Sequence, residues 1–197
     1  MASPGPTLPT APVPAVPESF ETDRLIVRAP GWDDGAAVNA AILESLPELQ
    51  AWMGWARPAP PLEETEANVQ RARLRYLRRL DLRLHLFHKE TGRFLGSSGL
   101  HRIDWALRRF EIGYWLRTSE TGRGYMTEAV AGIAAFAARE LGANRIEIRC
   151  DARNARSRRV AERLGFRLEG VLRGEALDAE GLPADEMIFA RVRGHEF

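Results

Sequence analysis

Cysteine is almost absent from this 197-residue sequence, which contains only Cys150. One cysteine excludes an intramolecular disulfide and any metal site built from several cysteines, and a reducing compartment such as the cytoplasm is the simpler setting. No apolar run approaches the roughly 20 residues that a membrane-spanning helix needs. Neither sign of charge dominates, because the formal net charge is +1, so no general attraction to nucleic acid or to an anionic membrane is expected.

The beginning of the chain has little potential for regular structure. Residues 1–17 are rich in proline and lack the basic start and apolar run of a signal peptide. We predict a disordered tail over residues 1–19, followed by a single domain over residues 20–197. A hydrophobic content of 45% and a charged content of 28% are ordinary for one globular domain.

Apolar periodicity predicts strands and helices in alternation after the tail. We expect helices after Asp33 and Asp34, which are candidate caps, then at 47–52, 63–79, 125–141 and 157–164. The turn at 89–92 predicts a hairpin, so neighbouring strands include antiparallel pairs. Strands are expected at 24–28, 82–87, 93–103, 108–117, 145–150, 166–173 and 187–193. The fold class is therefore α/β or α+β, with a mixed sheet of about seven strands flanked by helices.

A glycine-containing segment lies between a predicted strand and the helix that begins at residue 125. It reads Gly122-Arg123-Gly124-Tyr125-Met126-Thr127. Glycines allow a sharp turn that exposes backbone amides, and a helix N-terminus attracts anions, so the segment suits a pyrophosphate without a metal. A Gly-x-Gly pattern alone fits an ordinary loop before a helix equally well.

Three further segments complete a recognisable pattern. Asn154-Ala155-Arg156-Ser157 follows the next predicted strand, while Thr22-Asp23-Arg24-Leu25 and Glu111-Ile112-Gly113-Tyr114-Trp115-Leu116 precede the glycine segment. With these motifs the chain resembles the GNAT acetyltransferase superfamily, and specifically its RimJ/RimL-like branch, over about residues 20–193. The resemblance implies a GNAT fold in which two central strands splay apart.

The resemblance also implies a site for acetyl-coenzyme A, the cosubstrate of this family, and no metal. Pantetheine is then expected along the strand that ends at Leu116 and Arg117, with Asn154 also binding it and Ser157 close to the sulfur. The remaining residues implied for the pyrophosphate and its surroundings are Gly122, Arg123, Gly124, Tyr125, Met126, Thr127 and Arg159.

The chain departs from the family pattern at two positions. Ser119 stands where many members have arginine or glutamine, which removes one expected pyrophosphate contact. Ala161 stands where many members have the tyrosine that protonates the departing thiolate. We therefore expect Ser157 to stabilise or protonate the thiolate, directly or through water. The alternative is that Ser157 only caps its helix.

Acetyl transfer to an amine also needs a proton acceptor. Glu175, just beyond the strand at 166–173, and Glu111, on the strand at 108–117, are the candidate bases, although either fits a structural ion pair. An α-amine has a reference pKa of about 8, against about 10.4 for lysine, so water-relayed deprotonation is a third alternative. The four histidines show no zinc-binding spacing and are expected to be ordinary strand or surface residues.

The predicted activity is acetyl-coenzyme A-dependent N-acetylation of a primary amine by direct attack. The resemblance favours a protein N-terminal α-amine, as in ribosomal proteins, and a homodimer. The alternatives are a small amine such as an amino acid, polyamine or antibiotic, another acyl group, or an acyl-coenzyme A sensor without turnover. Cys150 is expected in the core, and Trp52, Trp55 and Tyr76 either in the core or along the acceptor cleft.

Overall fold

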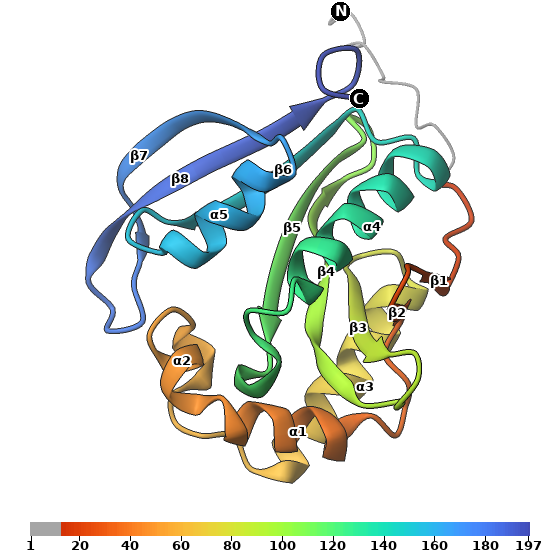
Figure 1. The fold of residues 1–197 in the computed structure, drawn as a ribbon, viewed down its shortest axis with the longest axis vertical. Coiled ribbons are helices and arrows are strands. Elements are labelled where there is room, and N and C mark those ends of the chain that lie inside the picture. Colours follow the sequence, from red (N-terminus) through yellow and green to blue (C-terminus); the bar gives the residue numbers. More distant parts are fainter. Residues whose placement is uncertain (1–12) are drawn as a thin grey trace, which may run out of the picture.

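A mixed sheet of eight strands runs through the centre of the molecule (Figure 1). The structure, a computed structural model, describes residues 13–197. The strand order is β1-β2-β3-β4-β5-β6-β8-β7, in which β5 and β6 are parallel and the other neighbours are antiparallel. The strands are β1 (Ser19–Glu21), β2 (Leu25–Arg28), β3 (Leu82–His88), β4 (Phe94–Asp104), β5 (Arg109–Leu116), β6 (Arg145–Asp151), β7 (Arg167–Leu177) and β8 (Pro183–Val192).

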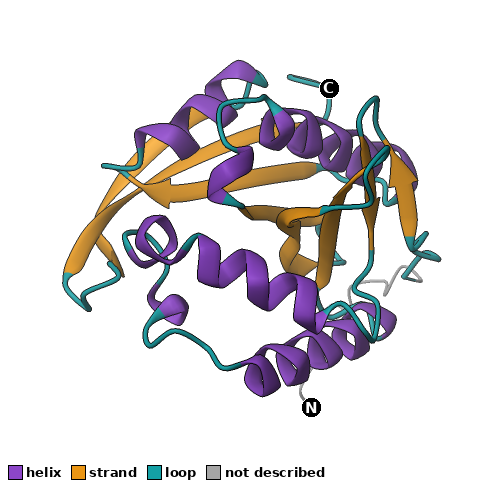
Figure 2. Cartoon of the chain, turned by 60° about the horizontal axis from the view of Figure 1, so that its bottom comes forward, coloured by secondary structure: helices purple, strands orange, loops and turns teal. Residues whose placement is uncertain are grey.

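Helices cover both faces of this sheet, as Figure 2 shows. Helices α4 and α5 lie on one face, and α1 and α3 pack on the other face against β4 and β3. No helix within residues 13–197 combines the length and the apolar character needed to cross a membrane. The helices are α1 (Gly35–Glu44), α2 (Leu46–Gln50), α3 (Leu62–Leu77), α4 (Tyr125–Glu140) and α5 (Ala155–Arg163), with short 3-10 turns η1 (Gly54–Ala56) and η2 (Thr118–Glu120).

Helix α4 anchors the main core. The predicted apolar stripe is confirmed, and Gly142, at φ 64°, lies two residues beyond its last residue. Burying large aliphatic and aromatic side chains contributes about 1.5 to 3 kcal/mol each, so this helix is firmly positioned relative to the sheet. The buried stripe consists of Met126, Ala129, Val130, Ile133, Phe136 and Ala137.

The parallel strands β5 and β6 are paired over only part of their length. Their register joins residues 109–111 to residues 145–147, after which the two strands diverge (Figure 1). Beyond Glu111, the edge of β5 that faces β6 therefore has no strand partner. This is the splay that the family resemblance implied, and it opens beside the N-terminus of α4.

The structure differs from the sequence prediction at the N-terminal end. Residues 1–12 of the predicted tail lie outside the described residues, but residues 13–19 are held against the domain. The Tyr76 hydroxyl donates a 2.6 Å hydrogen bond to the Pro17 carbonyl, and Arg79 donates one of 3.0 Å to the Val13 carbonyl. Ser19–Glu21 pairs with β2 as an additional strand. The sheet consequently has one strand more than predicted, because a three-residue strand depends on its partner rather than on a pattern of its own.

Candidate active site

The glycine segment, residues 122–126, forms a candidate phosphate turn at the start of α4. Gly122 and Gly124 have φ values of 78° and 81°, a region that favours glycine. Among the described residues, the amides from Gly122 to Met126 have no hydrogen-bond partner. Free amides at the N-terminus of a 16-residue helix fit the pyrophosphate of coenzyme A.

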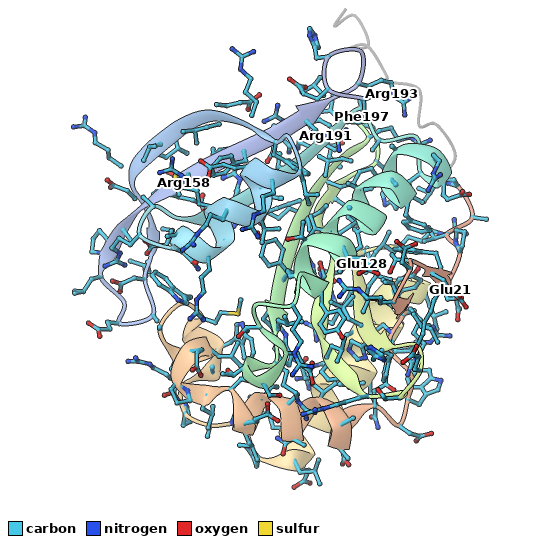
Figure 3. All side chains as sticks on the ribbon, in the orientation of Figure 1. Glu21, Glu128, Arg158, Arg191, Arg193 and Phe197 are labelled. Atoms are coloured by element: carbon cyan, nitrogen blue, oxygen red, sulfur yellow. The ribbon has the colours of Figure 1, made fainter. Side chains whose placement is uncertain are left out.

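Arg24, the residue before β2, contacts this turn. Its guanidinium donates to the Arg123 carbonyl at 3.0 Å and pairs with Glu128 at 2.6 Å. It also lies 4.4 Å from the centre of the Tyr125 ring. Figure 3 shows Glu128 on α4, beside the N-terminal strands. Arg24 was part of a recognised motif, but the sequence did not reveal that it positions the phosphate turn, because its contacts lie about a hundred residues away.

Ser119, the first departure from the family pattern, ties the turn to the helical layer. Its hydroxyl donates a 2.6 Å hydrogen bond to the Glu44 carboxylate at the end of α1. That bond, together with nearby Arg117 and Arg93, holds the pKa of Glu44 below its usual range. Ser119 thus has a structural role where other members supply a charged or amide side chain.

The turn makes a testable prediction at Gly124. A Gly124→Ala substitution forces alanine into a left-handed conformation, at a cost of about 1 to 2 kcal/mol. If this strain distorts the turn, it weakens coenzyme A binding by a similar free energy. We therefore expect the dissociation constant for coenzyme A, measured by calorimetry, to rise about tenfold. Gly142→Ala is the matched control, because φ there is also positive, at 64°, and a Cβ meets nothing within 4 Å. Equal coenzyme A affinity in both variants would contradict the assignment of the turn.

Ser157 lies across the splay from β5, on the first turn of α5. Asn154 caps this helix, since its Oδ1 accepts a 3.0 Å hydrogen bond from the Ser157 amide. The Ser157 hydroxyl is therefore not the cap, and it lies 2.9 Å from the Tyr114 hydroxyl. Burial raises the pKa of Tyr114 to about 12, so the phenol stays protonated at neutral pH. Many family members have a tyrosine at the position of Ala161, and in this chain Tyr114 brings a phenol to Ser157 from β5 instead.

Cys150 completes this group of polar atoms. Its side chain is buried, and its thiol forms a hydrogen bond with Ser157. Burial raises the pKa of the Cys150 thiol, so the neutral thiol is favoured and a nucleophilic thiolate is not. The expectation of a core cysteine is confirmed by its burial.

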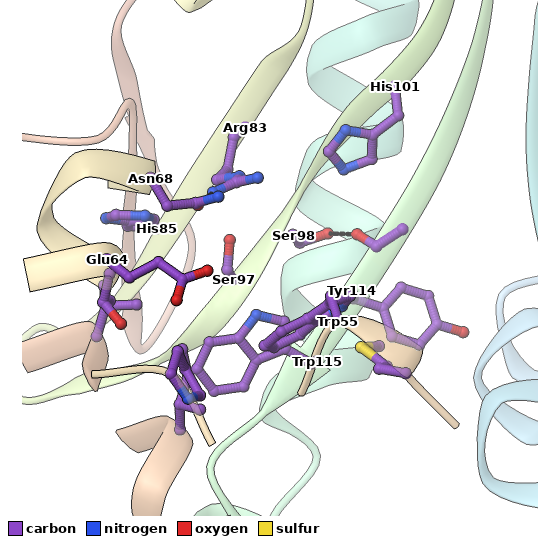
Figure 4. A pocket seen from close by; sticks show the side chains of 16 residues that line it. Trp55, Glu64, Asn68, Arg83, His85, Ser97, Ser98, His101, Tyr114 and Trp115 are labelled. Carbon is purple, nitrogen blue, oxygen red and sulfur yellow. Dashed lines mark hydrogen bonds between the residues drawn. The ribbon is translucent and has the colours of Figure 1, made fainter. Parts of the chain in front are cut away.

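A cavity of about 450 Å³ lies between the sheet and the α1–α3 layer. Its size is typical of a small-ligand site. It reaches β5 at Gly113, Tyr114 and Trp115, and therefore extends to the strand that borders the splay (Figure 4). Two tryptophans, Trp55 and Trp115, form an aromatic wall with ring centroids 6.3 Å apart. The polar side chains that line it are Glu64, Thr65, Asn68, Arg83, His85, Ser97, Ser98 and His101.

Two histidines of the cavity are each paired with an aspartate. His85 Nδ1 lies 2.7 Å from Asp34, and His101 Nδ1 lies 2.9 Å from Asp81. The His85 side chain is only 1% exposed, and its Nε2 has no hydrogen-bond partner in the structure. Both histidines lie on strands, as the sequence predicts, but it did not indicate their aspartate partners. No local pattern reveals them, since the partners are 51 and 20 residues apart in sequence.

The two predicted bases lie outside the lining of this cavity. Glu111 is 3.5 Å from both Arg102 and Arg149, and it borders a separate cavity of about 140 Å³. Burial raises the pKa of its carboxyl, while the two arginines partly oppose that shift. Glu175 is exposed on β7, and the structure does not bring it to the cavity wall.

The structure also shows where the remaining residues named from the sequence lie. Leu116, Arg117 and Thr127 border the splay or the phosphate turn, and the Arg117 side chain pairs with Glu44 at 3.2 Å. Arg159 is exposed on α5 and donates to the Ala155 carbonyl. Of the three aromatics that the sequence left undecided, Trp55 lines the cavity, Tyr76 is buried in the core and Trp52 is exposed.

Known proteins share both the sequence pattern and the fold. Residues 24–167 match the family model described as the acetyltransferase (GNAT) domain. The uncharacterized N-acetyltransferase YoaA of Bacillus subtilis (strain 168) is 27% identical over 90% of this chain and 98% of its own. The ribosomal-protein-serine acetyltransferase of Escherichia coli (strain K12) is 30% identical over 64% of this chain and 69% of its own.

The sheet and both helical layers also resemble a solved structure. RimL, a ribosomal L7/L12 α-N-protein acetyltransferase in complex with coenzyme A, superimposes with a TM-score of 0.83. It is 26% identical, over 89% of this chain and 98% of its own.

Proposed function

Because the chain belongs to the GNAT acetyltransferase family, we propose that this N-acetyltransferase transfers the acetyl group of acetyl-coenzyme A to a protein N-terminal α-amine. The observation that carries the acceptor class is the mixed polarity of the cavity. Its lining includes hydrogen-bond donors and acceptors along a wall of aromatic side chains. A peptide carries both N–H and C=O groups beyond its terminal amine, and these groups can form hydrogen bonds with the donors and acceptors of the cavity wall.

The charges of the cavity distinguish a peptide from a polyamine. Glu64 is the one carboxylate among the described lining residues, and Arg83 supplies a guanidinium. Arg83 donates to Asn68 at 2.6 Å and has no ion-pair partner within 4 Å among the described side chains. A second ammonium group of a polyamine would meet this cation, whereas a peptide carbonyl or an acidic side chain would be attracted to it. The names of the relatives support the same class, since two of them act on ribosomal proteins.

In this proposal, different residues around the splay bind coenzyme A and assist the departure of the thiolate. The free amides at the start of α4 bind the pyrophosphate, and the unpaired edge of β5 and Asn154 hold the pantetheine arm. The amine attacks the thioester carbonyl, a carbon–nitrogen bond forms, and the carbon–sulfur bond breaks. Ser157, supported by the Tyr114 hydroxyl 2.9 Å away, donates a hydrogen bond or a proton to the departing thiolate.

The test is release of free thiol from acetyl-coenzyme A in the presence of different amines. Peptides with free N-termini, polyamines, amino acids and aminoglycosides are offered in parallel, and each peptide has an N-acetylated twin as its control. We expect thiol release with free peptides and none with their blocked twins. Release with a small amine alone would replace the acceptor class, and tight binding without release in every arm would indicate an acyl-coenzyme A sensor.

The proposal includes a cellular location and an oligomeric state. We propose a cytoplasmic homodimer, since ribosomal proteins are acetylated there and the family resemblance implies dimers. Sedimentation velocity at micromolar concentration is expected to show a dimer. A monomer alone under those conditions would contradict it.

A further inference from the structure

We infer that His101, oriented by Asp81, is the group that removes the proton from the acceptor amine. The Asp81 carboxylate lies on the Nδ1 side of the ring at 2.9 Å. Burial raises the pKa of Asp81, but hydrogen bonding and attraction to His101 outweigh burial and leave it below its usual range. An ionised carboxylate can only accept, so Nδ1 carries the hydrogen and Nε2 presents a lone pair.

The position of the ring places that lone pair beside the reacting strand. A Cβ on Gly113 would lie 3.2 Å from Cδ2 and 3.5 Å from Nε2 of His101. The imidazole therefore lies directly against Gly113, which follows the last paired residues of β5 and faces the cavity. Figure 4 shows His101 on the same cavity as Tyr114, whose hydroxyl reaches Ser157 on the far side of the splay. An amine at this wall has a proton acceptor on one side and the thiolate donor on the other.

The competing groups are less well placed for this task. Glu111, opposite His101 in the β4–β5 register, borders the smaller cavity and is shared between two arginines. The His85 ring lies on β3, two strands from β5, so about 10 Å separates its strand from the splay. His101 is therefore the imidazole nearest to the point where the thioester must lie.

Each proton that moves in this step has a donor and an acceptor. The attacking amine loses one proton to His101 Nε2 as the carbon–nitrogen bond forms, and the resulting imidazolium is stabilised by Asp81. The thiolate gains a proton from Ser157, the Ser157 hydroxyl regains one from water, and the imidazolium releases its proton to water. The charged groups facing His101 are Asp81 and Arg83 from the β3 side, Arg102 on its own strand, Glu111 from β5 and Glu64 from α3.

The test is the pH dependence of kcat/KM for His101→Gln, measured with the acceptor found in the thiol-release panel. We expect a loss of about 100-fold at neutral pH and disappearance of the acidic limb that protonation of the imidazole causes. Unchanged affinity for coenzyme A shows that the cofactor side is intact. His195→Gln, which removes an exposed histidine at the C-terminal turn, is the control and should keep the wild-type profile.

Three outcomes separate this inference from the proposed function on which its acceptor depends. An acidic limb that persists in His101→Gln overturns the inference, and loss of the limb in Glu111→Gln or Glu175→Gln instead assigns the base to that carboxylate. Absence of thiol release by the wild-type protein overturns the proposed function. Should His101→Gln fold poorly, ¹⁵N imidazole spectra of the wild-type protein decide. A neutral His101 protonated at Nε2, instead of Nδ1, would contradict the proposal.

Discussion

Replacement of Ser157 by alanine is expected to lower kcat about 100-fold, the lower end of the usual contribution of a positioned proton donor. The reason lies in its hydrogen bonds. Asn154 already caps α5, so removing the Ser157 hydroxyl leaves the helix cap in place. What is lost is the hydroxyl that lies 2.9 Å from the Tyr114 phenol and that, in the proposed mechanism, donates to the departing thiolate. The dissociation constant for acetyl-coenzyme A should change by less than about threefold, since a group that acts mainly in the transition state affects kcat.

Single-turnover acetyl transfer and calorimetric binding of coenzyme A measure these two effects separately. Tyr114→Phe is the informative companion, because it keeps the aromatic ring and removes the phenol hydroxyl that contacts both the hydroxyl and the backbone carbonyl of Ser157. We expect it to lower kcat less than Ser157→Ala does. Equal losses in kcat and in cofactor affinity for Ser157→Ala would reduce Ser157 to a binding residue.

The elements that form the proposed cofactor side were predictable because their sequence signals are local. Gly122 and Gly124 adopt the positive φ values that a tight turn requires, and the apolar stripe of α4 follows them directly in sequence. Asn154 and Ser157 are three residues apart, the spacing of a helix cap. The divergence of β5 from its neighbour came from the resemblance, and the register, in which β5 and β6 pair only at residues 109–111 and 145–147, confirms it. Periodicity alone located the strands but not which of them pair.

The proposed acceptor side could not be predicted from the sequence, because tertiary contacts create it. Asp81 precedes β3 and His101 is on β4, and only the antiparallel register brings them together. His85 reads as one member of an alternating strand, and nothing near it in sequence reveals a partner. A cavity wall assembled from three strands and two helices has no single sequence segment that encodes it. For the same reason the identity of the acceptor has to be argued from the geometry of the cavity.

Asp34 shows how a correct local prediction can miss the larger role. It occupies the N-cap position of α1, as its sequence context indicates, but its side chain makes no capping hydrogen bond. The carboxylate instead accepts hydrogen bonds from Arg28 at 2.7 and 2.8 Å, from the Gly31 amide at 2.7 Å and from His85. Burial raises the pKa of Asp34, but these bonds outweigh it and hold the pKa far below its usual range.

Asp34→Ala is accordingly expected to lower the free energy of unfolding at neutral pH by about 3 kcal/mol, the cost of removing one partner of a largely buried pair. The substitution leaves His85 Nδ1 buried without an acceptor and Arg28 without its anion. Asp33→Ala is the matched control, since Asp33 is the exposed neighbour and its loss should change stability by less than about 0.5 kcal/mol. Urea denaturation of the two variants and the wild type provides the comparison.

The pH dependence of this difference follows from the sign of the shift. A carboxyl whose pKa is lowered by folding stabilises the native state above its unfolded pKa of about 3.9, and that contribution disappears as the pH falls through the folded pKa. The gap between wild type and Asp34→Ala should therefore be full at pH 7 and should shrink below about pH 4. A gap independent of pH would show that packing, and not the ionised carboxylate, is responsible.

Asp34→Ala should also affect the acceptor half of the site, because His85 lines the cavity. We expect a higher KM for the acceptor and unchanged coenzyme A binding.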